Sequence, residues 1–133
     1  DGLVTGVQTC ALPIFTLFVS NMNQARLQEN ATRAHYVAIS GVELTFAALT
    51  QGTTSTRLLN THFNKPINQS VSDLTETIVL SEGSASVTIS SYVEDGNRWV
   101  KIVSIGSLTD GTIVSKKIEM KFRADYPEIQ IWS

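Results

Sequence analysis

The sequence predicts an α+β domain in which one long N-terminal α-helix packs on an antiparallel β-sheet of three to five strands. Apolar residues recur at steps of three and four from Thr16 to about Gln51, which is the period of a helix. Beyond Leu74 apolar residues alternate with polar ones, the period of a strand, and Asp-Gly pairs predict hairpin turns between the runs. The 133 residues suffice for one domain. We divide them into residues 1–15, a helix at 16–51, a connection at 52–73 and a sheet region at 74–133.

The first fifteen residues, Asp1–Phe15, resemble a translated sequencing adapter and are excluded from the fold. Val4–Ile14 reads VTGVQTCALPI, which agrees in one reading frame with an adapter that is common in short-read libraries. The alternative is a genuine segment that matches by chance. On the adapter interpretation we expect the native N-terminus to be missing. Cys10 is the only cysteine, so the native remainder would hold no disulfide, thiolate metal site or cysteine nucleophile.

The charge balance gives no reason to expect a nucleic acid as a partner. The chain has ten Lys and Arg residues against twelve Asp and Glu residues, a formal net charge of −2. Without Asp1 the net charge is −1. A nearly neutral domain lacks the basic surface that attracts phosphate backbones or anionic membranes.

The predicted helix carries one face of apolar and small residues, which we call the small-residue face: Leu27, Ala31, Ala34, Ala38, Gly41, Val42 and Leu49. Small side chains let a helix approach its neighbour closely. That neighbour is either the sheet of the same chain or the helix of another subunit, and the two uses do not exclude each other. A helix of about 30 residues or more exceeds the average of globular proteins, so we expect support from outside the domain.

Both ends of the predicted helix are informative. Thr16–Val19 is apolar and is interpreted as the tail of a longer hydrophobic run whose beginning was lost. A transmembrane helix needs about 20 apolar residues, and no run of that length remains. At the other end, Gly52 is well placed to end the helix with a positive φ.

Several strands follow from the alternation. Ala85, Val87 and Ile89 alternate with serine and threonine, and Asp95-Gly96 predicts a hairpin to the next strand, Arg98–Ile105. A second turn is predicted at residues 109–112. The strand after it places four apolar side chains on one face, Val114, Ile118, Met120 and Phe122. The apolar face of this meander needs a cover, and the helix is the element available for it.

The connection and the C-terminal segment are less regular. Leu58–Val71 contains Pro66 and is predicted to be a connection with at most one short strand. Tyr126-Pro127-Glu128 is expected to break the last strand, after which Ile129–Trp132 adds a short strand. The proline favours an edge position for it.

No motif indicates catalysis, a cofactor or a metal site, so we expect a protein that is not an enzyme. His35 and His62 lack the spacing of helical metal ligands, and no serine lies in a G-x-S-x-G turn. A loose acidic group, Asp73, Glu76 and Glu82, lacks the spacing of a calcium loop. Trp99 and Trp132 either stack on a ligand or, more commonly, pack against the sheet.

The helix contains the residues of a family resemblance. Ser20–Leu49, and especially AHYVAISGVE at Ala34–Glu43, resembles the segment after the membrane helix in type IV pilin-like proteins, in particular PilX-type minor pilins. Members of that family have a motif similar to AYYIAEAGVE at the corresponding position. His35 and Ser40 depart from the family pattern. Glu43 belongs to the GVE motif and is not the assembly glutamate of the family, which would lie upstream.

The resemblance implies a pilin-like fold and a structural or minor subunit of a type IV pilus or a related secretion assembly. Its implied partners are other pilin subunits, through the N-terminal helix, and the membrane, through a missing upstream segment. It implies an exported bacterial protein that is anchored at the cell surface, with no cofactor. The alternative is a membrane-anchored surface module that binds a ligand with its sheet and uses the helix as a stalk.

Overall fold

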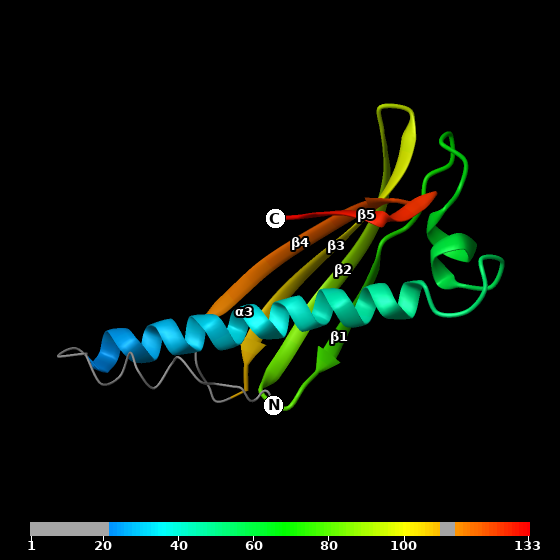
Figure 1. Cartoon of the computed structure of the whole chain (residues 1–133). Helices are drawn as coiled ribbons and strands as arrows, with labels where there is room; N and C mark the ends of the chain where they lie inside the picture. Colours follow the sequence, from blue (N-terminus) through cyan, green and yellow to red (C-terminus); the bar gives the residue numbers. More distant parts are fainter. Residues whose placement is uncertain (1–21, 110–113) are drawn as a thin grey trace.

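The protein has one α-helix packed on a five-stranded antiparallel sheet, as the computed structural model shows for residues 22–109 and 114–133 (Figure 1). The helix, α3, spans Met22–Leu49. The strands are β1 (Leu74–Val79), β2 (Gly83–Glu94), β3 (Asn97–Leu108), β4 (Ser115–Arg123) and β5 (Tyr126–Trp132). The predicted α+β class is confirmed. The predicted start of the helix at Thr16 lies outside the described residues, and α3 as described has 28 residues.

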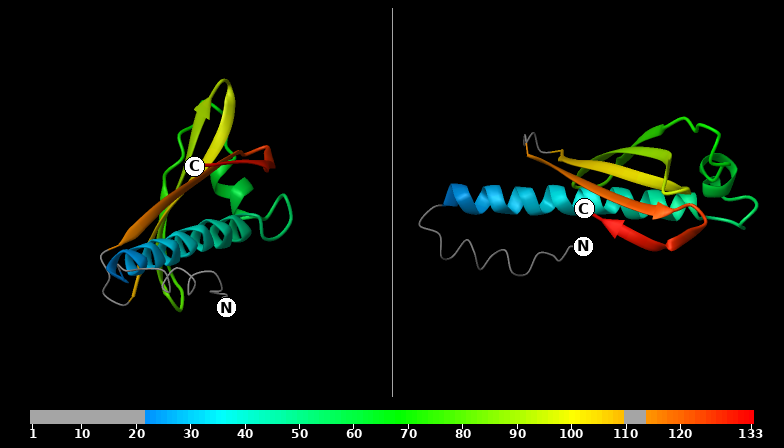
Figure 2. Two further views of the ribbon diagram at one scale, coloured as in Figure 1. Left: turned by 60° about the vertical axis from the view of Figure 1, so that its left-hand side comes forward. Right: turned by 90° about the horizontal axis from the view of Figure 1, so that it is seen from above.

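The strands follow one another across the sheet in the order of the sequence, β1-β2-β3-β4-β5, and every neighbouring pair is antiparallel. The two longest strands, β2 and β3, pair along their whole length at the centre. The two edges of the sheet are β1 and β5, which lie on opposite sides of the molecule (Figure 2).

Burial alternates along the central strands because only one face of the sheet is covered. In β2 and β3 every second residue is buried over most of their length. The buried side chains point at α3 and form the core together with Val42 and Leu49 of the helix: Ala85, Val87, Ile89, Val100, Ile102, Met120 and Phe122. Figure 2 shows α3 lying along this face, and Leu59 and Phe63 of the connection also join the core. The predicted alternation in β2 and β4 is therefore confirmed.

The helix lies close to the sheet because each of the two elements has a glycine at the contact: Gly41 of α3 faces the sheet, and Gly106 of β3 faces the helix. A Cβ atom at Gly41 of α3 would stand 2.5 Å from Ser104 Oγ and 2.6 Å from Ala85 Cβ. One at Gly106 of β3 would stand 2.3 Å from the carbonyl oxygen of Ala34. Such distances leave no room for a side chain at either position.

The first turns of α3 project beyond the sheet. Figures 1 and 2 both show the blue end of the helix reaching past the strands. Among the helix residues whose side chains are described, the fully buried ones begin at Ala34. The C-terminal part of α3 thus belongs to the core, and the N-terminal part lies outside it.

The Asp-Gly hairpin between β2 and β3 is confirmed. Asp95 and Gly96 have φ values of 53° and 75°, which is the backbone that a two-residue turn between twisted strands requires. Gly52 has a φ of 101°, in agreement with the predicted positive φ after the helix. Of the second predicted turn, at residues 109–112, all but Thr109 lies outside the described residues.

Two segments differ in detail from the sequence predictions. The connection is confirmed and holds no strand; it contains a π-helical turn that was not predicted, η1 (Leu59–Phe63), whose Leu59 and Phe63 are fully buried. The break between the last two strands falls at Ala124-Asp125 and not at Tyr126-Pro127-Glu128, because β4 ends at Arg123 and β5 begins at Tyr126. The predicted edge strand at Ile129–Trp132 is confirmed as the last part of β5. The register of β4 with β5 shifts between Phe122 and Arg123, and this irregularity accommodates the proline on an edge strand.

Candidate functional site

The small-residue face of α3 packs on the sheet of the same chain. Ala34, Ala38 and Val42 are fully buried, Leu49 is nearly so, and Gly41 lies against Ser104 and Ala85. Ala31 is half-buried, and the side chain of Leu27 lies outside the described residues. The sequence left two uses of this face open. Over Ala34–Leu49 the face packs on the sheet of the same chain. A role of this face in assembly stays a prediction.

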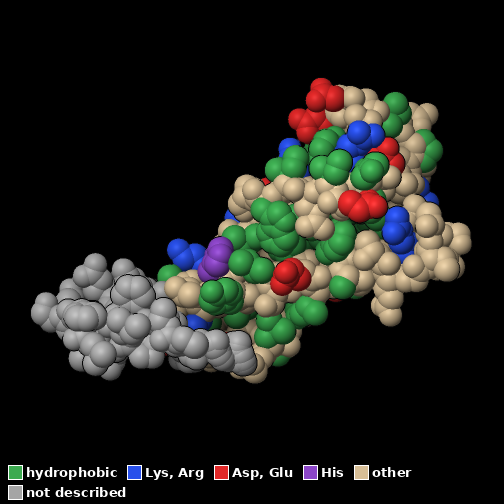
Figure 3. Space-filling model, in the orientation of Figure 1, with side chains coloured by type: hydrophobic (Ala, Val, Ile, Leu, Met, Phe, Trp, Pro, Cys, Tyr) green, Lys and Arg blue, Asp and Glu red, His purple; other side chains and the backbone are tan. Residues whose placement is uncertain are grey.

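The opposite side of α3 is open to solvent. It carries two large exposed hydrophobic residues, Tyr36 and Leu44, next to the exposed Glu43. Ala47 and Ala48 are exposed on the last turn. Figure 3, in the orientation of Figure 1, shows hydrophobic side chains mixed with charged and other polar ones. This side is the helix surface that a neighbouring molecule can reach.

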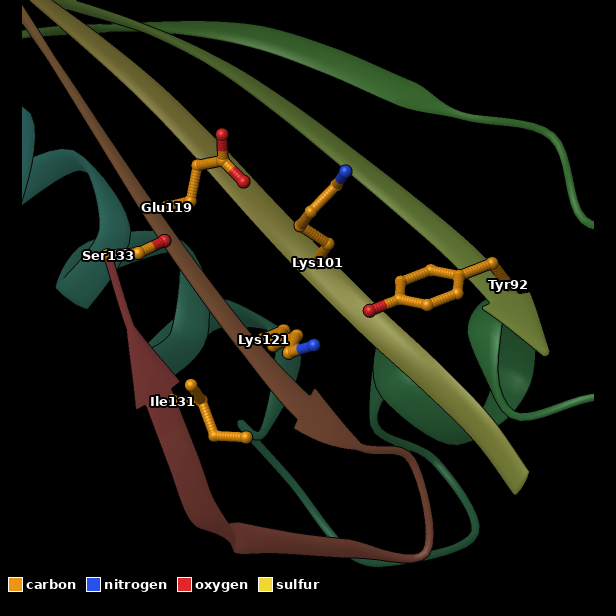
Figure 4. A pocket seen from close by; sticks show the side chains of 6 residues that line it. All are labelled: Tyr92, Lys101, Glu119, Lys121, Ile131 and Ser133. Atoms are coloured by element: carbon orange, nitrogen blue, oxygen red, sulfur yellow. The ribbon is translucent and has the colours of Figure 1, made fainter. Parts of the chain in front are cut away.

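The sheet face away from α3 carries an open depression of about 200 Å³ near the C-terminus (Figure 4). Its lining comes from four strands and the last residue: Tyr92, Lys101, Glu119, Lys121, Ile131 and Ser133. Beside it, Lys121 Nζ lies 5.3 Å from the ring centre of Trp99 and 3.9 Å from Glu94 Oε1. Lys101 Nζ lies 5.9 Å from the ring centre of Tyr92. Burial, with the carboxylates of Glu94 and Glu119, raises the pKa of Tyr92 above its ordinary value.

The two tryptophans do not form a common cluster. Trp99 lies opposite Tyr92 on the sheet face away from α3, whereas Trp132 is in register with Met120, which points to the helix side. Trp99 is half-buried, and its indole Nε1 has no hydrogen-bond acceptor among the described residues. The exposed Trp132 donates to Gln130 Oε1 at 3.3 Å. A ligand on one face could therefore contact only one of them.

The histidines and the acidic group have local structural contacts. His35 lies beside the ring of Tyr36, and His62 Nε2 lies 3.1 Å from the carbonyl oxygen of Ser72. Glu76 accepts a hydrogen bond from Thr45, and Glu82 forms an ion pair with Arg33. Within residues 22–109 and 114–133, no three His, Cys, Asp or Glu residues are grouped so as to hold a metal ion.

Arg98 forms a clamp that the sequence did not indicate. Its buried guanidinium donates to three main-chain carbonyls, those of Lys65 (3.1 Å), Pro66 (2.6 Å) and Gln69 (2.5 Å). It also donates to Ser91 Oγ at 3.2 Å, and Ser91 in turn donates to the carbonyl of Phe63. An arginine directly after a turn normally indicates a solvated strand end. No signal in the sequence therefore shows that Arg98 is buried and bound to main-chain carbonyls. The clamp fixes the connection to the sheet.

No protein-family model, characterised protein or solved structure matches the chain. The resemblance of Ala34–Glu43 to type IV pilins therefore stays a prediction. In the part of the chain that the structure describes, no helix is both long enough and apolar enough to cross a membrane.

Proposed function

We propose that the chain is a structural subunit of a type IV pilus or of a related filament or secretion assembly. The observation that carries this proposal is the arrangement of α3: its C-terminal part is bound to a sheet, and its N-terminal part projects beyond that sheet (Figure 1). A helix held in this way presents its free end to the helices of other subunits. The sheet then lies outside the layer that these helices form together. The pilin-like motif at Ala34–Glu43 lies on the same helix.

The open side of α3 supplies the contact surface in this proposal. Because the small-residue face is covered by the sheet, subunits meet through Tyr36, Leu44 and the alanines at positions 47 and 48. Full burial of an exposed side chain of this kind contributes about 1.5–3 kcal/mol, and Tyr36 and Leu44, which are 63% and 48% exposed, would contribute a corresponding part of it. An apolar segment upstream of Thr16 holds the subunit in the membrane before assembly and packs among other helices after it.

Resequencing the genomic DNA across the codon for Thr16 is the first test. We expect a short basic leader, a processing site and about 20 apolar codons that run into Thr16–Val19. The same codons for Asp1–Phe15 in the genome would contradict both the adapter interpretation and the pilin proposal.

Incorporation into filaments tests the function itself. The complete native gene, with a tag on the Asp95-Gly96 hairpin, is expressed in its source bacterium, and sheared surface filaments are separated from cells. We expect the subunit in the filament fraction, and we expect Leu44→Glu to reduce it because the charge falls on the open side of α3. Val79→Glu, at an exposed position on β1, is the matched control and leaves incorporation unchanged. A subunit found only in the membrane fraction argues against the proposal.

A second candidate, a membrane-anchored binding module, is favoured by the depression on the outer sheet face. Aromatic and lysine side chains lie together there, around Tyr92, Trp99 and Lys121. Such a group suits stacking on a planar or sugar ring, while Glu119 in the lining and Glu94 beside Lys121 balance the lysine charges. This candidate predicts a subunit that stays in the membrane fraction and whose Trp99 fluorescence changes with ligand. The shear experiment therefore separates the two functions.

A further inference from the structure

The connection between α3 and β1 contains a segment, residues 57–69, that we call the strap. Among the described residues, the main-chain hydrogen bonds of the strap stay within the connection and reach neither α3 nor a strand. Two of them close the turn at η1: the N–H of Asn64 donates to the carbonyl of Leu59 at 2.8 Å, and the N–H of Lys65 donates to that of Phe63 at 3.0 Å. The strap therefore folds on itself and takes no part in the hydrogen-bond network of the sheet.

Among the described contacts, side chains alone attach the strap to the core and the sheet. Leu59 and Phe63 of the strap are fully buried in the core. From the sheet, Arg98 donates to three carbonyls of the strap, and Ser91 donates to a fourth. Because one guanidinium holds three carbonyls at once, these contacts form and break together.

Both ends of the strap continue into exposed chain. Residues 51–56, which precede it, are exposed, and Gly52 has a φ of 101°. Residues 66–70, at its other end, are exposed as well. Figures 1 and 2 show the green helical turn of the strap past the C-terminal end of α3. The strap can therefore move without displacing the helix or a strand.

We propose that the strap opens as one unit while α3 and the sheet stay folded, and that the Arg98 clamp sets how often it opens. Segments that are attached by few contacts open with a lower free energy than the whole domain. In the closed form Leu59 and Phe63 cover the core at this end of the protein. In the open form they leave it, and an apolar site becomes accessible in a protein that is otherwise folded. This inference does not depend on the proposed function.

Native-state hydrogen exchange of the full chain, followed by nuclear magnetic resonance at low urea concentrations, tests the proposal. We expect the amides of Asn64 and Lys65 to share one opening constant, about tenfold or more above that of the most protected amides in β2 and β3. Their exchange is expected to depend weakly on urea, because opening of the strap exposes less surface than unfolding of the domain. Unequal constants for the two strap amides, or a urea dependence equal to that of β2 and β3, overturn the proposal.

Three substitutions separate opening of the strap from a general loss of stability. Arg98→Lys is expected to raise the opening constant of the strap about tenfold or more, because an ammonium group cannot reproduce the planar fork. Arg123→Lys, the same replacement in the exposed ion pair with Asp125, leaves that constant unchanged. Gly41→Ala weakens a helix–sheet contact that the closed and open forms share, so it raises exchange in β2 and β3 but not in the strap. A strap that responds to Gly41→Ala as β2 and β3 do, or that does not respond to Arg98→Lys, refutes the proposal.

Thiol labelling follows a buried side chain of the strap directly. In a Cys10→Ser background, Leu59→Cys is expected to react in the folded protein, at a rate that Arg98→Lys raises. Val87→Cys, a matched control at an equally buried position in β2, is expected to react only through unfolding. Circular dichroism checks that each variant folds. Equal rates for the two thiols mean that the strap opens only with the whole domain, which contradicts the proposal.

Discussion

Arg98 places a positive charge among main-chain carbonyls, which is an unusual way to satisfy a buried cation. The planar guanidinium has five donors in a fixed fork, and four of its hydrogen bonds reach Lys65, Pro66, Gln69 and Ser91. The carbonyls belong to a connection with little regular structure of its own. One side chain therefore holds the part of that segment from Lys65 to Gln69 against the sheet.

Arg98→Ala is expected to lower the free energy of unfolding by about 3 kcal/mol, because the hydrogen bonds of a buried, charged donor to three carbonyls and to Ser91 Oγ are lost. Arg98→Lys is expected to recover less than half of this loss, since an ammonium group cannot reproduce the fork. Urea denaturation measures both values. Arg123→Ala, which removes the exposed ion pair with Asp125, is the control and costs less than about 1 kcal/mol. A similar small loss at Arg98 would show that the clamp is not a source of stability.

Tyr92 gives a prediction on pH. Its pKa lies above the ordinary 10.0, first because of burial and then because of Glu94 and Glu119. The folded protein holds this proton more tightly than the unfolded chain, so the contribution of Tyr92 to stability is complete below pH 10 and is lost as pH rises through the folded pKa. In an ultraviolet absorbance titration, Tyr92→Phe removes a tyrosinate component that appears above pH 10. Glu94→Gln moves that component to lower pH without abolishing its shift, and an unmoved component would contradict the assignment.

At the scale of elements, the contact of α3 with β3 depends on the absence of side chains. Gly41→Ala gains up to about 1 kcal/mol of helix propensity but places a methyl group 2.5 Å from Ser104 Oγ. Overpacking of this kind costs about 1–3 kcal/mol, so we expect a net decrease in stability, measured by thermal unfolding. Glu43→Ala, at an exposed position two residues along the same helix, leaves stability nearly unchanged. A Gly41→Ala protein that is more stable than the original would mean that the helix can move away from the sheet without a loss of stability.

The elements that the sequence predicts well are those whose packing is periodic. Val87 and Ile89 alternate with polar residues because one face of β2 meets α3, and Asp95-Gly96 carries its own turn chemistry. The turn at Leu59–Phe63 is only five residues long, so its two buried side chains do not recur often enough to form a detectable helical or strand period. In the sequence Tyr126-Pro127 resembles the end of a strand, because proline has no N–H group to donate to a neighbouring strand. The proline is tolerated within β5 because β5 is an edge strand. The clamp of Arg98 depends on residues about 30 positions earlier, which local patterns do not reveal.

At the scale of the molecule, the helix and the sheet share one core and are expected to unfold as one cooperative unit. The sheet is a meander of sequence neighbours, so its pairing is local, but its inner face is apolar and has α3 as its cover. A three-layer protein could lose one helix and keep a core. The described part of this chain has two layers, so the sheet without α3 is expected to lose its core.

A chain of residues 52–133 is therefore expected not to fold. Without α3, Val87, Ile102 and Phe122 face water, and the core loses its helical half. Nuclear magnetic resonance is expected to show poor dispersion, and a hydrophobic dye is expected to bind. The added peptide 22–51 restores a folded spectrum if the loss is one of packing alone. Cooperative unfolding of the sheet by itself would refute this view of the fold.

The one-sided cover of the sheet also affects how the gene can change. A mutation at Val87 or Ile89 meets α3, so selection for folding removes most replacements there. A mutation at Ser86 or Thr88, between them, alters only a hydrated surface. Apart from half-buried residues such as Tyr92 and Trp99, the outward positions of the central strands can therefore change more freely, and a lineage can adapt the outer face to a new environment while the fold stays the same.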